Sequence, residues 1–369
     1  MARISIILLV CIVPILTGCQ PSPVVLSIHA NPGDPAIQAV IDQVSQEQYQ
    51  SYHLTVENMG LGLYGGKEFD MGYRNRDFYI YDDSKSDEGP TYDDGPTPGN
   101  REACLYLQDM YGAMGLSVSV QGKYKNVVGE LTGTTTPENI YIIGAHYDHI
   151  EGDMPGGDDN ASGTAGVLEA ARVLSQYRFE STIRFINFNA EEDDLAGSAD
   201  YVKNHVIPNS EKIVGMINLD AILRPGSDAM PDRPIDVEIE CNGPLIWVRA
   251  YAQAMADYVP SLVLGDIWDY AESSSDNDSF QNAGFPAFLV IENSDGDWYP
   301  PNPVANPYIH HFEDATDRLA NDPNSDSGVT YDFAFATDIV RACTALLVQE
   351  AKLVPRPAEA MGVGSVAKR

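Results

Sequence analysis

The sequence predicts an α/β protein, a three-layer sandwich in which helices cover both faces of a mixed, mostly parallel central sheet. From residue 127 onward, short runs rich in Ile, Val and Phe alternate with segments whose apolar residues recur at helical spacing. Such alternation favours a mainly parallel sheet that is buried on both faces. Polar and acidic residues directly follow several of the runs, as in open α/β sheets that bind ligands at the carboxyl ends of their strands.

Three segments precede this alternation. Residues 35–58 carry a broken helical pattern of apolar residues and are expected to form a first helix. Residues 60–100 are rich in Gly, Tyr and Asp and predict a long irregular excursion, a kind of segment that is either functional or disordered. Residues 101–115 again have apolar residues at helical spacing and predict a second helix.

The alternating part of the chain supplies the strands and the remaining helices of the predicted sandwich. The expected strands span residues 127–131, 140–143, 182–188, 213–219, 235–239 and 285–291. The expected helices span residues 162–174, 196–206, 245–258 and 331–353. Because the sequence shows neither an internal repeat nor a second core, residues 35–353 are expected to form one domain, and residues 354–369 a flexible tail.

The N-terminus has the features of an export signal. Arg3 precedes an apolar segment, residues 4–16, that is too short to span a bilayer. The segment ends in Leu16-Thr17-Gly18-Cys19, which resembles a bacterial lipoprotein signal. The resemblance implies that residues 1–18 are removed, that Cys19 carries lipid and anchors the protein to the cell envelope, and that residues 19–34 form a tether. An ordinary signal peptide cleaved nearby is the alternative, and both predict export.

The charge of the chain excludes one class of partner. The chain has 54 acidic and 22 basic residues, which gives a net charge of −32. We do not expect nucleic acid as a partner, because its phosphates require Lys and Arg. An acidic excess of this size keeps a soluble protein dispersed and attracts cations.

One histidine and one acidic glycine-rich loop suggest a metal site. His146 and Asp148 lie just beyond the predicted strand 140–143, and positions i and i+2 of an extended segment lie on the same side. The loop that follows contains Asp159 and leads into the next predicted helix. We therefore expect a metal centre with His146 and Asp159 among its ligands. The alternative from this stretch alone is a solvated acidic loop with a surface histidine.

Further candidate ligands follow other predicted strands. Glu191 and Glu192 come soon after strand 182–188, Asp220 follows strand 213–219, and His310 precedes the last helix. Histidines together with carboxylates suit zinc. Five candidate ligands exceed the three that one catalytic zinc usually takes from a protein, so two metals that share one carboxylate are expected.

The order of these elements resembles that of the co-catalytic dizinc aminopeptidase family, which also includes glutamate carboxypeptidase-like enzymes. The resemblance covers roughly residues 103–312 and implies a zinc-exopeptidase-like fold. The motifs that carry it are, in chain order, Gly144-Ala145-His146-Tyr147-Asp148, Asp159-Asn160-Ala161-Ser162-Gly163, Ala190-Glu191-Glu192, Asn218-Leu219-Asp220, Ser275-Asp276, Gly284-Phe285-Pro286 and Tyr308-Ile309-His310.

The resemblance implies a role for each candidate residue. One zinc would be held by His146, Asp159 and Asp220, and the other by Asp159, Glu192 and His310, so that Asp159 bridges the two. Its neighbour Asp158 is excluded as the bridge because Asp159 directly precedes Asn160-Ala161-Ser162-Gly163. Glu191 would be the general base, and the carboxylate of Asp148 would fix the imidazole of His146.

Three positions depart from the family pattern. Asn277 stands where the family often has His after Ser-Asp, and Asp194 stands where Gly is common. Ile309 replaces the Tyr that several members have directly before the final ligand. The donor to the transition-state oxyanion therefore stays open, with Tyr308 one position away.

The expected activity is zinc-dependent removal of an N-terminal residue from a peptide substrate. A glutaminyl cyclase uses the same fold with a single zinc, and the presence of His146 together with Asp220 favours two. A carboxypeptidase would need basic residues near the motifs, and the chain has few Arg there. The last alternative is an inactive surface-binding lipoprotein, against which the complete ligand set argues. Residue preference and oligomeric state stay open.

Overall fold

The structure is a computed structural model of the whole chain. It describes residues 5–7, 26–60, 63–64, 67–68, 98–150, 155–224, 236–241, 245–269, 275–292, 306, 308–310, 314–316 and 331–355. Cys19, most of the predicted excursion 60–100 and residues 356–369 lie outside this part of the chain.

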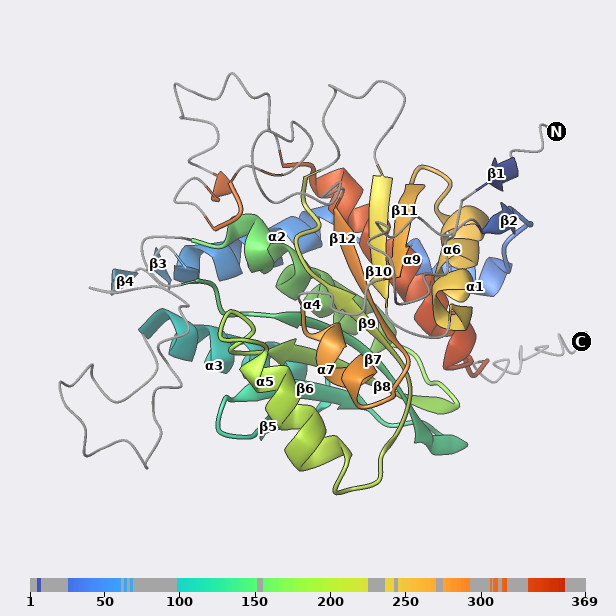
Figure 1. Ribbon diagram of the computed structural model, residues 1–369. Coiled ribbons are helices and arrows are strands. Elements are labelled where there is room, and N and C mark those ends of the chain that lie inside the picture. Colours follow the sequence, from blue (N-terminus) through green and yellow to red (C-terminus); the bar gives the residue numbers. More distant parts are fainter. Residues whose placement is uncertain are drawn as a thin grey trace, which may run out of the picture.

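An eight-stranded sheet forms the centre of the molecule, with the strand order β11-β10-β12-β9-β7-β8-β6-β5 (Figure 1). Strands β7, β8, β9 and β12 run parallel to their neighbours among themselves, while β5, β6 and the β10–β12 pair add antiparallel contacts. The strands are β5 (Ser117–Gln121), β6 (Asn126–Leu131), β7 (Thr136–His146), β8 (Ser181–Phe188), β9 (Lys212–Leu219), β10 (Asp236–Cys241), β11 (Val263–Asp269) and β12 (Ala287–Glu292).

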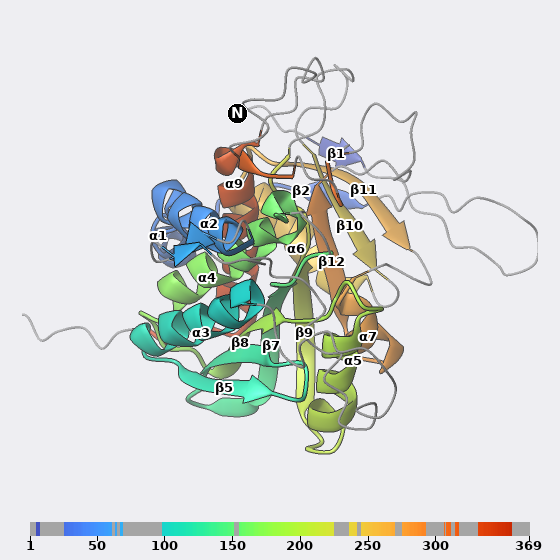
Figure 2. The same cartoon turned by 90° about the vertical axis from the view of Figure 1, so that its left-hand side faces the viewer.

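Helices cover both faces of this sheet, as Figure 2 shows from the side. One layer contains α1 (Pro35–Ile41), α2 (Gln46–Gly60), α3 (Pro98–Ala113), α4 (Gly163–Leu174), α6 (Ile246–Tyr258) and α9 (Phe333–Glu350). The other layer contains α5 (Ala196–Tyr201), the π-helical turn η3 (Val202–Val206) and α7 (Asn277–Asn282). The predicted three-layer sandwich with a mostly parallel mixed sheet is confirmed.

The central strand β7 shows why its sequence is a continuous apolar run. Ile140 and Ile142 pack into the core on the α5 side, whereas Tyr141 and Ile143 pack into the larger core beneath α4. Alternate side chains of a strand point to opposite faces, so a strand covered on both faces needs apolar residues at every position.

Several element boundaries differ from the predictions. The segment predicted as one helix over 35–58 forms two, because Asp34 caps α1 and the chain turns after Ile41 before α2 begins. Strand β7 extends well beyond the predicted 140–143 at both ends. Strand β5 was not predicted because its residues are exposed and it has no apolar run. Strand β11 and helix α7 were not predicted either, because Gly265 and Asp266 interrupt the apolar residues of β11 and α7 carries a single apolar residue, Phe280.

The prediction that residues 19–34 form a free tether is wrong for its described part, residues 26–34. Leu26 is fully buried and Ile28 is 8% exposed, and both belong to the main core. The backbone N–H of Asn31 donates to Asp257 at 2.7 Å, and that of Asp34 donates to the Tyr258 hydroxyl at 3.0 Å. The segment is thereby fixed to the end of α6.

Two short strand pairs complete the described structure. Strand β1 (Ser5–Ile7), inside the predicted signal peptide, pairs with β2 (Ser27–His29), and β3 (Leu63–Tyr64) pairs with β4 (Lys67–Glu68), both antiparallel. Within the described ranges, none of the helices has the length and hydropathy needed to span a membrane.

Replacing Leu26 tests whether this N-terminal segment is part of the folded domain. We expect Leu26→Ala to lower the free energy of unfolding by about 2–5 kcal/mol, because it leaves a cavity in a close-packed core. Denaturant unfolding measures the change. The control is His29→Ala, at an exposed position directly after Ile28 in the same segment. Equal stability of the two variants would contradict the docking.

Candidate metal centre

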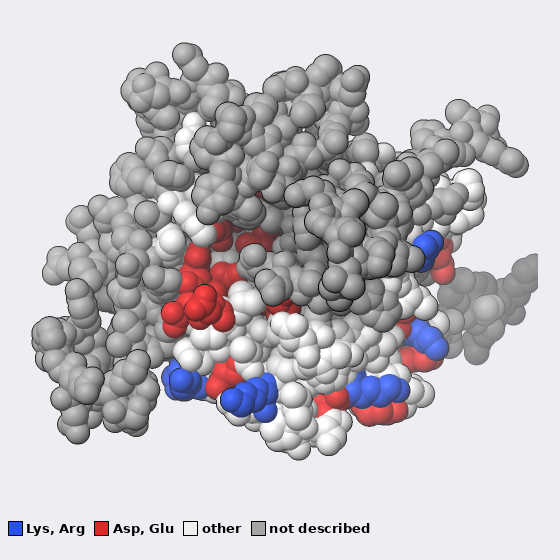
Figure 3. Space-filling model, in the orientation of Figure 1, with Lys and Arg blue, Asp and Glu red and all other residues white. Residues whose placement is uncertain are grey.

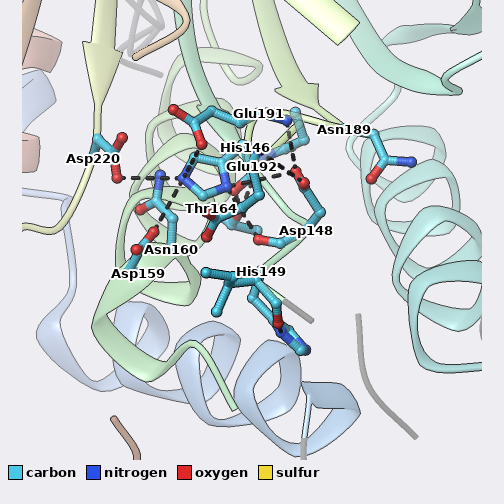
Figure 4. A network of polar contacts seen from close by, with 12 residues as sticks. His146, Asp148, His149, Asp159, Asn160, Thr164, Asn189, Glu191, Glu192 and Asp220 are labelled. Carbon is cyan, nitrogen blue, oxygen red and sulfur yellow. Dashed lines mark hydrogen bonds and ion pairs between the residues drawn. The ribbon is translucent and has the colours of Figure 1, made fainter. Parts of the chain in front are cut away.

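The predicted site residues meet at the carboxyl ends of the parallel strands (Figure 4). His146 is the last residue of β7, and Asp220 directly follows β9. Glu191 and Glu192 lie in the turn after β8, and Asp159 lies in the π-helical turn η2 (Gly157–Ser162) that leads into α4. Parallel strands bring their ends to one edge of the sheet, so residues that are distant in sequence come together there.

The carboxylate of Asp159 lies between two histidines. Its Oδ1 is 3.2 Å from Nε2 of His146, and its Oδ2 is 3.0 Å from Nε2 of His310. Each oxygen of the carboxylate therefore faces a different imidazole.

The remaining acids divide into two groups around these histidines. Nε2 of His146 is 3.3 Å from Asp220 Oδ1 and 3.9 Å from Glu191 Oε2, and Nε2 of His310 is 3.3 Å from Glu192 Oε2. In each group, three potential ligand atoms lie within 4.8 Å of one another. The two groups are His146, Glu191 and Asp220, and Asp159, Glu192 and His310.

Burial makes the negative charge of these glutamates costly. Burial raises the pKa of Glu191 well above its ordinary value, and the nearby carboxylates of Asp220 and Glu192 act in the same direction. Burial also raises the pKa of Glu192 to about 6, with Asp159 as the next cause.

At His146 and Asp159, burial and the neighbouring charges shift the pKa in opposite directions. Burial alone would lower the pKa of His146, but Asp220 and Glu191 raise it well above its ordinary value. Burial of Asp159 is likewise outweighed by its contacts with His146 and His310, which hold its pKa well below the usual range. Four carboxylates face two imidazoles in a largely buried space, so the donor set has an excess of negative charge. Mixed nitrogen and oxygen donors with this excess fit divalent zinc.

Asp148 acts on the two glutamates as well as on His146. Nδ1 of His146 lies 3.1 Å from the main-chain oxygen of Asp148 and 3.6 Å from its carboxylate. The carboxylate accepts hydrogen bonds from the backbone N–H groups of Glu191 at 3.3 Å and Glu192 at 3.4 Å. The main-chain carbonyl thus makes the shorter contact with the imidazole, and the carboxylate fixes the turn that carries both glutamates.

The residues after Asp159 hold its loop against β9. The Asn160 amide donates to the main-chain oxygen of Leu219 at 2.9 Å and accepts from the N–H of Gly163 at 2.8 Å. The hydroxyl of Ser162 accepts from the N–H of Ile222 at 3.0 Å. A Cβ on Gly163 would lie 2.4 Å from the oxygen of Leu219, so only glycine allows this approach. The Asp159–Asn160 peptide bond is cis.

Helix α2 and a buried aspartate support the same loop from behind. His53 Nε2 lies 2.7 Å from the main-chain oxygen of Gly157, and the Tyr49 hydroxyl donates to that of Ser162 at 3.1 Å. The carboxylate of Asp314 accepts from the N–H groups of Asp158 at 2.7 Å and Asp159 at 3.1 Å. The loop therefore has little freedom to move the bridging carboxylate.

Asp158 points away from the two metal groups. Its carboxylate accepts hydrogen bonds from the N–H of Leu223 and from the amide of Asn306, both at 2.9 Å. These donors occupy both oxygens of the Asp158 carboxylate.

Ser275 contacts the site, and no role for it was predicted from the sequence. Its hydroxyl donates to Asp220 Oδ2 at 2.6 Å and accepts from the Asn218 amide at 2.7 Å. The other oxygen of Asp220 is thereby left to face His146. The position directly before Asp276 in the Ser-Asp motif was the signal that could have revealed it. Asn277, which replaces the family's His, is buried at the start of α7.

A buried amide network, also missed at the sequence level, fixes the turn after β8. The side chains of Asn189 and Asn100 exchange hydrogen bonds at 2.9 and 3.3 Å, and the Asn189 amide also donates to the main-chain oxygen of Tyr124 at 2.8 Å. The N–H of Asn189 donates to Asn126 at 3.1 Å. A Cβ on Gly197 would lie 1.7 Å from the Asn189 oxygen, so this position also requires glycine.

Three residues with positive φ shape the chain at the site. Ala190, directly before Glu191, has φ 66°, Ala221, directly after Asp220, has φ 52°, and His310 itself has φ 61°. Non-glycine residues rarely adopt this left-handed conformation, which persists where surrounding contacts enforce it and which gathers at functional sites.

The fold and the site together define a class of protein: a zinc exopeptidase-like α/β sandwich with a cluster of carboxylates and histidines at the strand ends. Residues 126–329, more than half of the chain, match the profile of peptidase family M28. The chain belongs to this family of zinc metallopeptidases, and the resemblance seen in the sequence is confirmed.

Relatives known from sequence include peptidases of fungi. A probable zinc metalloprotease of Pyrenophora tritici-repentis is 31% identical over 150 residues, which are 39% of this chain and 30% of that protein. A probable aminopeptidase of Saccharomyces cerevisiae is 29% identical over 216 residues, 54% of this chain and 53% of that protein. The chain therefore spans about a third to a half of the length of these relatives.

Solved structures share the fold at low identity. The aminopeptidase LapA of Legionella pneumophila has a TM-score of 0.62 at 20% identity, covering 86% of this chain and 74% of that one. A glutaminyl cyclase of Bacteroides thetaiotaomicron has a TM-score of 0.57 at 17% identity, covering 84% and 99%. The fold by itself thus does not distinguish hydrolysis from cyclisation.

Exchanging the amide of Asn189 for a carboxylate tests the amide network. We expect Asn189→Asp to retain bound zinc but to lower kcat for peptide hydrolysis by roughly tenfold or more. An ionised carboxylate donates no hydrogen bond to Tyr124 or Asn100, so the turn that carries the glutamates would shift. A shift of about 1 Å at a reacting group costs up to about 10²-fold in rate. Asn209→Asp makes the same change at an exposed position and is the control. An unchanged kcat in Asn189→Asp would show that the network does not position the glutamates.

Proposed function

We propose that this protein is an aminopeptidase that hydrolyses the N-terminal peptide bond of peptides with the help of two zinc ions. The observation that carries the proposal is the position of Asp159, whose two oxygens face His146 and His310 in two separate ligand groups. A centre for a single metal needs no such carboxylate.

The residues that would hold the metals form two overlapping sets. His146, Asp159 and Asp220 would hold one zinc, and Asp159, Glu192 and His310 the other. When bound, a zinc pair of this kind polarises a carbonyl oxygen and lowers the pKa of a water from 15.7 toward about 7.

Glu191 is the residue placed to move protons. It belongs to the His146 group by position, yet it is not needed as a ligand once Asp159 completes that set. Burial raises its pKa well above the ordinary value, which makes its carboxylate a better base. We assign it the proton of the attacking water, which it then passes to the leaving amine. Asp148 holds the turn in which Glu191 stands.

The surroundings of the centre favour a cationic substrate terminus. Figure 3 shows acidic side chains gathered on the face above the strand ends, and Asp193 and Asp194 next to the catalytic pair are exposed. Carboxylates attract the α-ammonium group of a peptide and repel its C-terminal carboxylate. This supports an aminopeptidase over a carboxypeptidase, and the LapA structure is that of an aminopeptidase.

Glutaminyl cyclisation is the second candidate, because a cyclase shares the fold. The complete group around His146, with Asp220 held by Ser275 at 2.6 Å, supports a second metal and therefore hydrolysis. A panel of aminoacyl, N-blocked and N-terminal glutaminyl substrates separates the two activities and also tests the inactive-protein alternative.

Changing each of the two adjacent glutamates to glutamine should affect kcat and bound zinc differently. Glu191→Gln should keep both metals and the fold but lose at least about 10²–10⁴-fold in kcat, because the amide cannot accept the proton. Glu192→Gln should lower bound zinc as well as rate, because it removes a charged ligand. Bound zinc and kcat are measured for both, with Glu138→Gln, an exposed position at the far end of β7, as the matched control.

Near wild-type turnover of Glu191→Gln would rule out its role as general base. Full zinc content in Glu192→Gln would remove it from the ligand set while leaving the role of Glu191 intact.

The number of metals is tested by elemental analysis. We expect two zinc ions per chain at saturation, since the centre offers two ligand groups. His310→Ala should lose mainly one ion, whereas Asp159→Ala should weaken both, because only Asp159 belongs to both sets. A chelator should abolish hydrolysis and lower Tm, since a metal that binds the native state stabilises it. A saturated wild-type chain with one zinc would contradict the two-metal proposal.

We also propose that the protein is exported and anchored to the bacterial cell envelope through lipid on Cys19. The support is the motif Leu16-Thr17-Gly18-Cys19 after an apolar segment. Since one acyl chain binds a membrane only weakly, two or more are expected. Cys19→Ser should move the protein from the membrane to the soluble fraction, and normal processing and membrane retention of this variant would contradict the anchor.

A further inference from the structure

Strand β5 ends the central sheet, and no strand in the described part of the chain pairs with its outer edge. Among the strands that the structure describes, β5 pairs with β6 alone, and Figures 1 and 2 place it at the border of the molecule. Its residues pair with β6 continuously from Ser117 to Gln121, without a bulge. Edge strands are usually protected by charges, proline or bulges, and the sequence Ser-Val-Ser-Val-Gln contains none of these.

One face of this edge is apolar and exposed. Val118 and Val120 are each 37% exposed and, being two residues apart, lie on the same face of β5. Helix α3 packs beside β5 and carries Leu105, which is 44% exposed. These three residues are among the few large apolar side chains exposed in the described part of the chain.

The opposite face of the edge is polar and close to neutral. Ser117, Ser119 and Gln121 line a cavity there together with Arg184. The guanidinium of Arg184 is paired with Glu130 at 2.8 Å and with Glu211 at 2.6 Å. The arginine that lines this cavity is therefore already paired with carboxylates of the same chain.

The alternation of polar and apolar residues in β5 is symmetric about Ser119. An antiparallel pair centred on that residue sets Ser119 opposite Ser119 of a second copy, Val118 opposite Val120, and Ser117 opposite Gln121. Apolar residues then meet apolar residues on one face, and polar residues meet polar ones on the other, as an isologous two-fold interface requires. Two copies with a net charge of −32 each repel over most of their surface, and β5 offers an approach that contains no charged side chain.

We propose that two copies of this chain pair antiparallel along β5 and join their eight-stranded sheets into one continuous sheet. Strands β6 and β8 separate β5 from β7, whose end carries His146, so this pairing leaves the metal centre open. The proposal is independent of the enzymatic activity, and its test measures association rather than turnover.

Disulfide trapping in the full chain tests both the pairing and its register. Directly opposed residues of antiparallel strands have Cα atoms about 4.5–5.5 Å apart, within the span of a disulfide, whereas residues displaced by four positions are too far apart. Ser119→Cys should therefore form a disulfide-linked dimer in membranes of the producing cells at roughly tenfold the yield of Ser117→Cys. Combining Ser117→Cys with Gln121→Cys should restore the yield, and the wild type controls for the native cysteines.

Charge insertion tests the interface without cysteine. Val118→Lys with Val120→Lys sets like charges opposite each other across the two-fold axis and should shift the chain from dimer to monomer in sedimentation. Ile246→Lys makes the same change at a side chain that is 74% exposed on α6 and should leave the dimer intact. Zinc content should be unchanged in all variants. Equal trapping of Ser117→Cys and Ser119→Cys, or a monomeric wild type, would overturn the proposal.

Discussion

The site depends on the carboxylate of Asp159, which stands between two imidazoles that come from distant parts of the chain. In the proposed centre a shift of this one group would separate the two ligand sets, because Asp159 alone is assigned to both. Its loop is accordingly fixed on every side: Asn160 ties it to the end of β9, His53 meets it from α2, and Asp314 binds its backbone N–H groups. The bridging geometry is thus a property of the surrounding layers as much as of Asp159.

This arrangement concentrates charge where the fold can least solvate it. Buried carboxylates are costly unless cations or hydrogen-bond donors compensate them. Asp158 and Asp314 are compensated by backbone N–H groups and an amide, whereas Glu191, Glu192 and Asp220 face the histidines and one another. The first pair therefore has a supporting role, and the second set is the part of the site that gains most from two divalent ions.

Fold and reaction are only loosely coupled in this architecture, since structures of an aminopeptidase and of a glutaminyl cyclase both share it. The local residues carry the distinction. Ile309, in the place of a family tyrosine, packs with Ala221, Leu289 and Ile291 in a small apolar cluster. The side chain at this position therefore contributes packing and carries no group that could donate a hydrogen bond to an oxyanion.

The sequence by itself determined the fold class, the order of the strands and helices along the chain, and the identity of the candidate ligands. Apolar periodicity is a local property, and the motifs around His146, Asp159 and Glu191 are contiguous in the chain, so both are visible without a structure. Only the tertiary structure decided that the main-chain oxygen of Asp148 makes the shorter contact with His146 and that Ser275 and Asn100 belong to the site. It also decided that residues 26–34 pack against α6. Strand β5 was also not predicted, because an exposed edge strand does not require a continuous run of apolar residues. These features depend on contacts between segments far apart in sequence, which local patterns do not specify, although the Ser-Asp motif marked the position of Ser275.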